Sequence, residues 1–579
     1  MTADFNEEQS EKIAEELSMV PAIINLLGLR GLLKKEDIID HLNPSLNQLP
    51  YPHLMKGMDE AVNILAEAVT KQRPVGIFGD FDADGITSTA VLYLFLQELK
   101  VPVVRYIPNR LTEGYGLNSK GIKGIHAHNI QNTGEPGILL TVDCGISDAE
   151  IVSEAKQLGF TVIVTDHHKP PKKLPDADAI LNPLQPDCAF PFKDLAGVGV
   201  AFYLILGLRS HLMANEHWQV DEIPNLKSYM DLVAIGTLAD QVSVLGANRV
   251  IIKAGLEVLS LNPKVGIRKL LDSSNFNGHA LEADDIVFRL APRLNAAGRV
   301  GSAQTAVELL TTVDPDHAAR LAGELEQAND FRKEIDRAVF EEAAKMAAEE
   351  IQRGRKSLVL YNGKWHAGVL GIVASRLTES FHCPTILLTD STLDDLQGEE
   401  LVKGSGRTIE GLDLFETISA CSSLLKRFGG HVGAAGLTLS KKDIDQFKDI
   451  FETEVTSNLS GKESIPSLII DRQTSIHEIA DMDFLSSYAR LSPFGQNNPK
   501  PIFSLSGHKL HSAKLVGKNH LRFSVEDNNC SLQGIGFGFG DMLSLVREQT
   551  LMDIAFTLQL NSYRRRENWE IRLVDIKPS

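Results

Sequence analysis

Three aspartates at alternate positions, Asp80, Asp82 and Asp84, give the sequence its clearest potential for chemistry. They follow the apolar run VGIFG and precede Gly85, so they stand at the end of an expected strand. Alternate carboxylates on an extended segment can supply several oxygen ligands to hard divalent cations. A solvated acidic turn is one alternative to a metal site. A calcium loop of the EF-hand type is another, but it requires a glutamate six positions after the glycine, where the chain has Val91.

Further acidic residues end three more apolar runs along the chain. Asp143 follows LLTV, and Asp240 ends LVAIGTLA. Asp166 follows VIVT and is itself followed by His167 and His168. Taken singly, Asp143 is as well explained as a helix cap, and an Asp-His-His sequence can arise by chance. Imidazole nitrogens beside carboxylates can, however, bind a metal and a phosphate. Because the four segments fall in one stretch of chain, they together indicate a dinuclear metal site.

The stretch from Val75 to Val244 must position these side chains. It alternates β-rich apolar runs with helical runs, a pattern that predicts an α/β domain with a doubly wound parallel sheet. Such sheets bind their ligands at the carboxyl ends of the strands. Asp80, Asp143 and Asp166 each end an expected strand, so the sheet would gather them along that edge.

The remaining sequence predicts further parts. A run rich in Ala, Glu and Leu predicts a long connecting helix, interrupted at Asp314-Pro315. A second α/β module follows and is expected to form a cleft with the first. Short β-like runs after Ser460 predict a small β-barrel, with an OB-fold as a candidate. The expected parts are an N-terminal helical lead-in at 1–50, the first α/β domain at 51–300, the connecting helix at 301–355, the second α/β domain at 356–455 and the β-barrel at 460–579.

Composition argues against several classes of protein. No apolar run in the 579 residues approaches the ~20 residues that a membrane span requires. The N-terminus, MTADFNEEQSEKIAEEL, is acidic and polar, unlike a secretory signal. Five scattered cysteines without CxxC spacing argue against disulfides and a thiolate zinc site and favour a reducing cytoplasm. A formal net charge of −18 disfavours nucleic acid on average, although bound cations and a local basic groove can offset it.

The acidic segments resemble, in order, the motifs of the DHH phosphoesterase superfamily. The segment Gly429–Gly436, GGHVGAAG, is similar to the glycine-histidine motif of the second domain (DHHA1) that accompanies this family. Three other segments resemble the RecJ-like subgroup of exonucleases, namely Pro108–Arg110, Arg293–Arg299 and Ser405–Arg407. The match extends from Val75 to Leu437, and the β-rich tail fits the OB domain of the subgroup more loosely.

The resemblance implies roles for individual residues, with a pair of Mn²⁺ or Mg²⁺ ions as cofactor. Asp82 would bind one ion, and Asp143 would bridge the two. The second ion would be held by Asp84, His167 and Asp240. The catalytic residues implied are Asp80, Asp166, His168 and His431. Many relatives carry a histidine four residues before the first ligand aspartate, where this chain has Phe78. The first site would therefore be rich in oxygen ligands, which favours Mn²⁺ or Mg²⁺ over zinc.

The resemblance also implies an exonuclease that degrades single-stranded DNA processively from the 5′ end to mononucleotides, in recombination and repair. It would act together with a helicase and a single-strand-binding protein, and it would not act at a membrane. A terminal phosphate requires bidentate donors and close backbone approach. The residues expected to supply them are Arg110, Arg293, Ser405, Arg407, Gly429 and Gly430. In the tail, Arg564–Arg566 with Tyr563 and Trp569 suit backbone attraction and base stacking.

Two other functions remain open at this point. The first is a phosphatase or oligonucleotide phosphodiesterase of the same superfamily that acts on a small substrate. Such enzymes usually need only the two α/β modules, so the β-rich tail favours a polymeric substrate. The second is a DNA-binding scaffold without catalytic activity, which would have no need of a dinuclear metal site.

Overall fold

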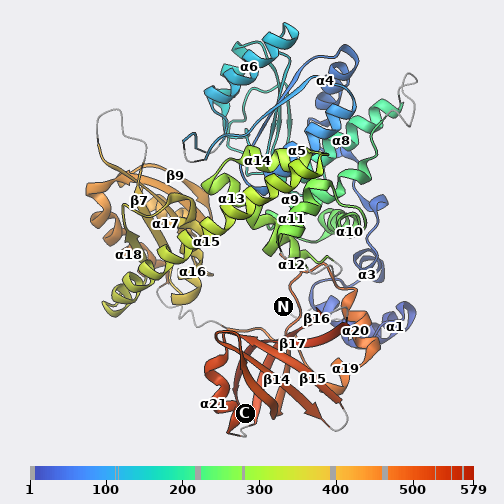
Figure 1. Cartoon of the computed structure of the whole chain (residues 1–579), viewed down its shortest axis with the longest axis vertical. Coiled ribbons are helices and arrows are strands. Elements are labelled where there is room, and N and C mark those ends of the chain that lie inside the picture. Colours follow the sequence, from blue (N-terminus) through green and yellow to red (C-terminus); the bar gives the residue numbers. More distant parts are fainter. Residues whose placement is uncertain are drawn as a thin grey trace.

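A computed structural model shows three sheet-containing parts, of which the first two are joined by a long helix (Figure 1). It describes residues 7–110, 112–114, 116–214, 223–274, 276, 281–391, 399–459, 467–527, 530–548, 551–563 and 566–579. Arg564 and Arg565, from the expected basic cluster of the tail, lie outside the described residues.

The first α/β domain contains a five-stranded parallel sheet with the order β2-β1-β3-β4-β5. Its strands are β1 (Val75–Gly79), β2 (Val103–Tyr106), β3 (Ile138–Val142), β4 (Thr161–Thr165) and β5 (Ala179–Leu181). The strand order reverses between β1 and β3, the point at which doubly wound sheets bind ligands. Asp80 follows β1 and Asp143 follows β3, so both residues lie at this switch point. The predicted doubly wound sheet is confirmed.

Helices cover both faces of this sheet. Phe78 and Val162 face a core that includes α6 and α7, whereas Ile77 and Ile163 face a larger core with the other helices. Neighbouring residues of one strand thus point to opposite faces, and both faces are apolar because both are covered. The helices are α4 (Met58–Lys71), α5 (Ala83–Glu98), α6 (Ser119–Thr133), α7 (Ala149–Gln157), α8 (Gly197–Ala214), α9 (Met230–Ala239), α10 (Gly246–Leu261), α11 (Val265–Ser273), α12 (Ala283–Asp285), the π-helical turn η5 (Ile286–Leu290), α13 (Ala291–Val300) and α14 (Ala303–Thr311).

One helix of 38 residues, α15 (Pro315–Gln352), runs from the first domain to the second (Figure 1). Asp314 caps its first turn by accepting hydrogen bonds from the amides of Asp316 and His317, and Pro315 occupies the first helical position. At ~1.5 Å per residue the helix is about 57 Å long. The interruption expected at Asp314-Pro315 is therefore the boundary between α14 and α15.

The second domain is a mixed five-stranded sheet with helices on both faces. Ala343 of α15 and Val373 of α16 belong to the core on one face, and Phe447 and Phe451 of α18 belong to the core on the other. The strands, in the order β6-β7-β8-β10-β9, and the helices are β6 (Leu358–Tyr361), β7 (Thr385–Asp390), β8 (Leu401–Arg407), β9 (Leu425–His431), β10 (Ala434–Ser440), α16 (Leu370–Phe381), α17 (Leu414–Ala420) and α18 (Ile444–Leu459).

The β-rich C-terminal part is a seven-stranded sheet with the order β11-β12-β16-β17-β15-β14-β13. Its elements are β11 (Arg472–Gln473), α19 (Ile476–Ala480), α20 (Met482–Ala489), β12 (Phe503–His508), β13 (Leu510–Val516), β14 (His520–Asp527), β15 (Cys530–Phe537), α21 (Leu543–Arg547), β16 (Met552–Tyr563) and β17 (Arg566–Pro578). Trp569, considered above for base stacking, packs edge-on against Tyr488, with 5.6 Å between the ring centroids.

The N-terminal helices pack on this C-terminal sheet. They are α1 (Glu7–Leu17), α2 (Pro21–Leu29) and α3 (Lys35–Leu42). Ile23 and Leu27 of α2 share one hydrophobic core with Phe484 and Phe503. The two ends of the chain therefore form one folded unit, which we call the terminal unit (α1–α3 with residues 467–579). The sequence predicted the helices but not this association.

A buried arginine joins the terminal unit to the first domain. The side chain of Arg249, on α10, is 2% exposed. Its guanidinium donates to the carbonyl oxygen of His41 at 2.6 Å and to those of Arg490, Ser492 and Pro493 at 3.2, 2.8 and 3.3 Å. Four carbonyl groups from both ends of the chain thus converge on one cation, in what we call the Arg249 junction.

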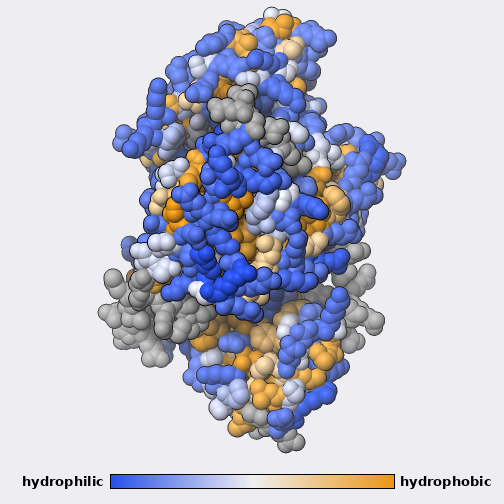
Figure 2. Space-filling model, turned by 90° about the vertical axis from the view of Figure 1, so that its left-hand side faces the viewer, coloured by the Kyte–Doolittle hydropathy of each residue, from blue (hydrophilic) through white to orange (hydrophobic). Residues whose placement is uncertain are grey.

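Helix α8 is long and apolar enough to cross a membrane by length and composition, but two-thirds of it is buried inside the first domain. It is thus a core helix, and no other described helix passes the same test. The face of the molecule shown in Figure 2 carries mainly hydrophilic residues, with smaller hydrophobic groups between them.

Candidate metal centre and phosphate pocket

The segment from Asp80 to Asp84 forms a tight turn between β1 and α5. Asp82 is the N-cap of α5, and its Oδ1 accepts hydrogen bonds from the amides of Asp84 and Gly85 at 3.0 and 3.1 Å. Asp84 then reaches across to α8, where its two oxygens accept from the amides of Gly197 at 2.6 Å and Val198 at 2.8 Å. Backbone amides thus hold two of the three carboxylates in place.

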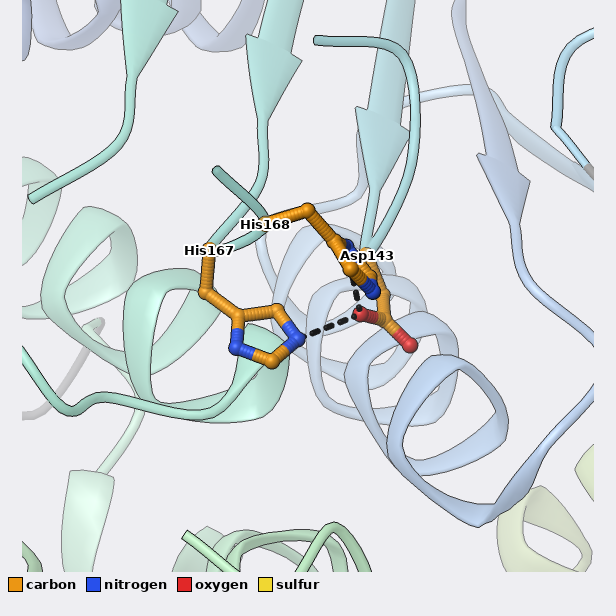
Figure 3. Close-up of side chains that lie close together, drawn as sticks. All are labelled: Asp143, His167 and His168. Carbon is orange, nitrogen blue, oxygen red and sulfur yellow. Dashed lines mark ion pairs between the residues drawn. The ribbon is translucent and has the colours of Figure 1, made fainter. Parts of the chain in front are cut away.

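Asp143, His167 and His168 meet beyond the ends of β3 and β4 (Figure 3). Asp143 has a left-handed backbone with φ of 59°, which aspartate tolerates better than most residues. His167 Nε2 lies 3.1 Å from Asp143 Oδ1. Asp166 Oδ1 lies 2.7 Å from His168 Nδ1, and Asp166 also accepts the amide of Ile146 at 3.0 Å. Asp166 therefore orients His168 rather than pointing into the centre itself.

Three groups of side chains place one potential ligand atom each close enough to surround a cation. They are Asp80 with Asp82 and Asp143, Asp84 with His167 and Asp240, and Asp143 with His167 and His168. Asp240 caps the end of α9, and its Oδ2 lies 3.7 Å from His167 Nδ1. The structure thus brings together all five expected metal ligands and adds Asp80 and His168 to the candidates.

Burial and mutual repulsion make the charged form of these carboxylates unfavourable without a counterion. Burial, followed by the charges of neighbouring carboxylates, raises the pKa of Asp80, Asp143 and Asp240 well above the usual range and that of Asp84 to about 7. Burial and the charge of His168 lower the pKa of His167 to about 4, which leaves its imidazole neutral and able to donate a lone pair.

Several atoms of the centre are buried without a hydrogen-bond partner. These are Oδ1 of Asp80, Oδ1 of Asp143 and Nε2 of His167, of which the last two lie 3.1 Å apart without hydrogen-bond geometry. Buried polar atoms are almost always paired in proteins, so three such atoms close together indicate a site that takes a ligand. Carboxylate oxygens with little imidazole match the preferences of Mn²⁺ and Mg²⁺. The donor set therefore fits divalent cations.

A cavity of about 600 Å³ opens beside the Asp80–Asp84 turn, between the two α/β domains. Phe81 and Arg110 line it on one side, and Lys403, Ser405 and Arg407 of β8 line it on the other. The Arg110 guanidinium lies over the Phe81 ring, 4.8 Å from its centroid. Burial and the charge of Arg110 lower the pKa of both Lys403 and Arg407, as expected for cations gathered in one place. We call this cavity the phosphate pocket, because its cations make it a candidate site for a phosphate group.

The glycine-rich hairpin of the second domain supplies His431 to the same pocket. His431 ends β9, and its Nδ1 accepts the amide of Gly433 at 3.2 Å, so the proton of the neutral ring resides on Nε2. Gly430 also lines the pocket and has φ of 151°, a conformation that favours glycine. Gly429 is adjacent to Gly430 on β9.

The structure places Arg293 differently from the sequence interpretation. Arg293 is 7% exposed and pairs through Nη2 with Glu326 of α15 at 2.9 Å, while Nη1 donates to the carbonyl of Arg289 at 2.6 Å. It is not among the described residues that line the phosphate pocket. Its guanidinium is engaged in packing α13 on α15, and the expected role in holding a terminal phosphate is not supported by this geometry.

Sequence reasoning overlooked Lys403. It stands two residues before Ser405 and four before Arg407 in the strand LVKGSGR, and alternate residues of a strand share one face. If residues 401–407 are read as a strand, this alternation places Lys403 on the same face as Ser405 and Arg407, and it is the signal that could have identified Lys403.

Comparison with known proteins agrees with this geometry. The model of the DHH family, N-terminal domain, matches residues 74–237, that of the DHHA1 domain matches residues 354–457, and that of the RecJ OB domain matches residues 470–575. The three models thus follow one another along the chain in the order in which the three sheets appear.

Similar proteins cover nearly the whole chain. The single-stranded-DNA-specific exonuclease RecJ of Salmonella typhimurium is 36% identical, over 98% of each chain. The protein of the same description from Bacillus subtilis is 34% identical, over 98% of this chain and 70% of its own length. The crystal structure of RecJ in complex with Mn²⁺ from Thermus thermophilus superimposes with a TM-score of 0.81 at 30% identity and covers 99% of this chain and 78% of that chain. The chain therefore belongs to the RecJ family of the DHH superfamily.

Proposed function

We propose that the chain is a single-stranded-DNA-specific exonuclease that hydrolyses phosphodiester bonds from the 5′ end with two divalent cations, Mn²⁺ or Mg²⁺. The observation that carries the proposal is the position of the phosphate pocket. Phe81, which lies between Asp80 and Asp82 in the chain, lines this pocket, and the Arg110 guanidinium lies over its ring. Arg110 is also close enough to Asp80 and Asp82 for their charges to favour its protonated form. One end of a strand can therefore be held where a neighbouring phosphodiester would meet the metal ligands.

The ligand sets suggest how the two ions would be held. Asp80 and Asp82 would hold one, Asp84, His167 and Asp240 the other, and Asp143 would serve both. When bound, two such ions activate a water molecule and stabilise the charge that develops on the attacked phosphate and the leaving oxygen. The chain then has no need of a nucleophilic side chain, which agrees with the carboxylates and imidazoles that dominate the centre.

Two histidines are proposed to assist the reaction from opposite sides of the cleft. Burial opposes the charge of His168, but the hydrogen bond and charge of Asp166 raise its pKa to about 9, so the ring is suited to donate to a phosphate oxygen. His431 presents Nε2–H from the second domain and would donate to the scissile phosphate or to the leaving oxygen. In this scheme Asp166 acts through His168.

The phosphate pocket is proposed to select the 5′ terminus. Arg110 and Arg407 can each bind a phosphate bidentately, and Lys403 and Ser405 can add further donors. The amides around Gly430 can approach the phosphate closely because no side chain intervenes. A terminal phosphate carries more charge and more free oxygens than an internal one, so this pocket would favour it.

The terminal unit is proposed to bind the single strand outside the cleft. Its β-rich part matches the RecJ OB domain, and folds of this type bind strands through basic grooves and stacking. Stepwise release of mononucleotides, a role in recombination and repair, a cytoplasmic location and work alongside helicase and single-strand-binding proteins remain predictions of the same proposal.

The test incubates the protein and Mn²⁺ with a single-stranded oligonucleotide, a blunt duplex of the same sequence and pyrophosphate. We expect mononucleotides from the single strand, a resistant duplex and no product when EDTA replaces the metal. Hydrolysis of pyrophosphate with an intact single strand would replace the proposal by the small-substrate function.

A further inference from the structure

Helix α13 carries the motif RLNAAGR, from Arg293 to Arg299, and its polar side chains contact separate parts of the molecule. Arg293 pairs with Glu326 of α15. Asn295 accepts a hydrogen bond at 2.8 Å from the amide of Ala83, the first residue of α5. Arg299 Nη1 donates at 3.1 Å to the carbonyl of Gly368 in the second domain. The helix thus lies between the Asp80–Asp84 turn, the connecting helix and one wall of the cleft.

Asn295 completes the capping of α5. The first amides of a helix have no partner within the helix. Asp82 Oδ1 satisfies those of Asp84 and Gly85, and Asn295 satisfies that of Ala83. Because Asp82 and Asp84 belong to two candidate metal groups, a shift at Ala83 would move both ligands.

Gly298 brings α13 directly against the same turn. A Cβ atom at this position would lie 2.3 Å from the carbonyl oxygen of Phe81, the residue between Asp80 and Asp82. Only glycine permits this approach without displacing the turn. Two residues of α13, one turn apart, therefore fix the turn from one side.

The residue after Gly298, Arg299, connects the same end of α13 to the phosphate pocket. Gly368, which accepts from Arg299, lines the pocket. Burial, followed by the charges of Arg110 and Arg332, lowers the pKa of Arg299 to about 10, and the carbonyl of Gly368 gives this buried cation a partner. The contact is therefore more than a surface hydrogen bond.

We propose that Asn295 and Gly298 are positioning residues that hold the Asp80–Asp84 turn in its cation-binding geometry, on a helix that Arg299 links to Gly368 in the wall of the phosphate pocket. The inference rests on the proposed function for its role in DNA cleavage, but it makes a claim about metal affinity that stands without it. Residues that orient metal ligands typically change metal affinity by ~10–100-fold when they are replaced.

The test measures Mn²⁺ binding by isothermal titration calorimetry, with no DNA present, in wild type, Asn295→Ala and Gly298→Ala. We expect the dissociation constant to rise by ~10-fold in each variant. Gly298→Ala is informative because alanine favours a helix over glycine, so a loss of affinity would come from the displaced turn and not from a weakened helix. It also provides the test if Asn295→Ala does not fold.

Two matched variants serve as controls. Asn129→Ala removes a buried side chain of α6 that donates a hydrogen bond to the carbonyl of Pro136 at 2.7 Å. Gly323→Ala adds a methyl group to α15 at a position where nothing lies within 4 Å. Both should bind Mn²⁺ as wild type does. Binding within twofold of wild type in both α13 variants, or an equal loss in the controls, would overturn the inference. Because calorimetry needs no turnover, an inactive wild type would refute the proposed function alone.

Discussion

The first α/β domain meets its two neighbours in contrasting ways. Toward the second domain it leaves a cavity of about 600 Å³ lined by Arg110, Lys403 and Arg407. Toward the terminal unit it buries Arg249 among four carbonyl groups, and Val244 donates its amide to the carbonyl of Gln496 at 3.0 Å. Arginines thus lie at both interfaces, but those of the cleft can bind an incoming anion whereas Arg249 already has its acceptors.

The comparison explains how one chain can hold a polymer at a fixed catalytic centre. Asn498 strengthens the closed junction by donating to the carbonyls of Leu491 and Pro493 at 3.0 and 2.8 Å, and it accepts a hydrogen bond from Arg30. We propose that this hydrogen-bonded junction keeps the terminal unit in one orientation, while the cleft admits the substrate. We propose that arginine serves stability at the Arg249 junction and recognition in the cleft, and the predictions below separate these roles.

The largest effect is expected from Asp143→Asn, which removes a charged metal-ligand candidate and leaves both domain interfaces in place. Activity with Mn²⁺ should fall by more than ~10³-fold, because Asp143 is proposed to serve both ions. Turnover of a labelled single strand measures this loss. Circular dichroism should show an unchanged fold, since asparagine has the same shape. Activity within tenfold of wild type would remove Asp143 from the centre.

Arg249→Met should destabilise the Arg249 junction by about 3 kcal/mol, because four buried or partly buried carbonyl groups would lose a charged donor. Hydrogen-deuterium exchange should become faster in residues 490–500 and in α3, while turnover of a trinucleotide stays within threefold of wild type. Arg320→Met is the control, because the Arg320 side chain is 62% exposed and its one ion pair within the described part of the chain is with Glu324, one turn away. Unchanged exchange in Arg249→Met would show that the junction does not depend on this residue.

Binding of Mn²⁺ in the cleft should raise the free energy of unfolding by about 2.7 kcal/mol when Mn²⁺ is present at 100 times its dissociation constant. The melting temperature in Mn²⁺ should therefore exceed that in EDTA. In Asp143→Asn this gain should disappear, and the metal-free variant should melt no lower than the metal-free wild type, since one repelling carboxylate is gone. A metal-free variant that melts several degrees lower would contradict the view that the buried carboxylates destabilise the empty centre.

Arg407→Ala should cause the smallest of these effects and the most selective one. A loss of ~10-fold, or about 1.4 kcal/mol, is expected on 5′-phosphorylated strands, with less effect on 5′-hydroxyl strands. The ratio of kcat/KM for the two substrates measures the selectivity. Equal losses on both ends would show that Arg407 does not recognise the terminal phosphate.

Local patterns predicted the elements and most of the centre. Asp80, Asp143 and Asp166 each end an apolar strand, and the parallel sheet brings such strand ends to one edge. The DHH and RecJ motifs, recognised by resemblance, pointed to the family. These features are local in sequence, so one chain was sufficient to find them.

Long-range partners were not predictable in the same way. The sequence suggested Arg293 as a phosphate ligand, but in the structure it pairs with Glu326, which lies 33 residues further along the chain. Arg249 gave no signal, because its acceptors are backbone carbonyls that any sequence provides. The apolar faces of α1–α3 did not reveal that their partner lies at the other end of the chain. Removing the residues after Ser460 would therefore also expose these helices, so a loss of DNA binding in that truncation would have two explanations.

The polarity of cleavage tests the central claim most directly. A single-stranded oligonucleotide labelled at either the 5′ or the 3′ end is mixed with the protein and Mn²⁺, and the products are resolved over time. Immediate release of labelled mononucleotide from the 5′-labelled strand, with gradual shortening of the 3′-labelled strand, is the result we predict. Mononucleotide released first from the 3′ label, or internal cuts in both strands, would contradict a pocket that holds the 5′ terminus beside the metal centre.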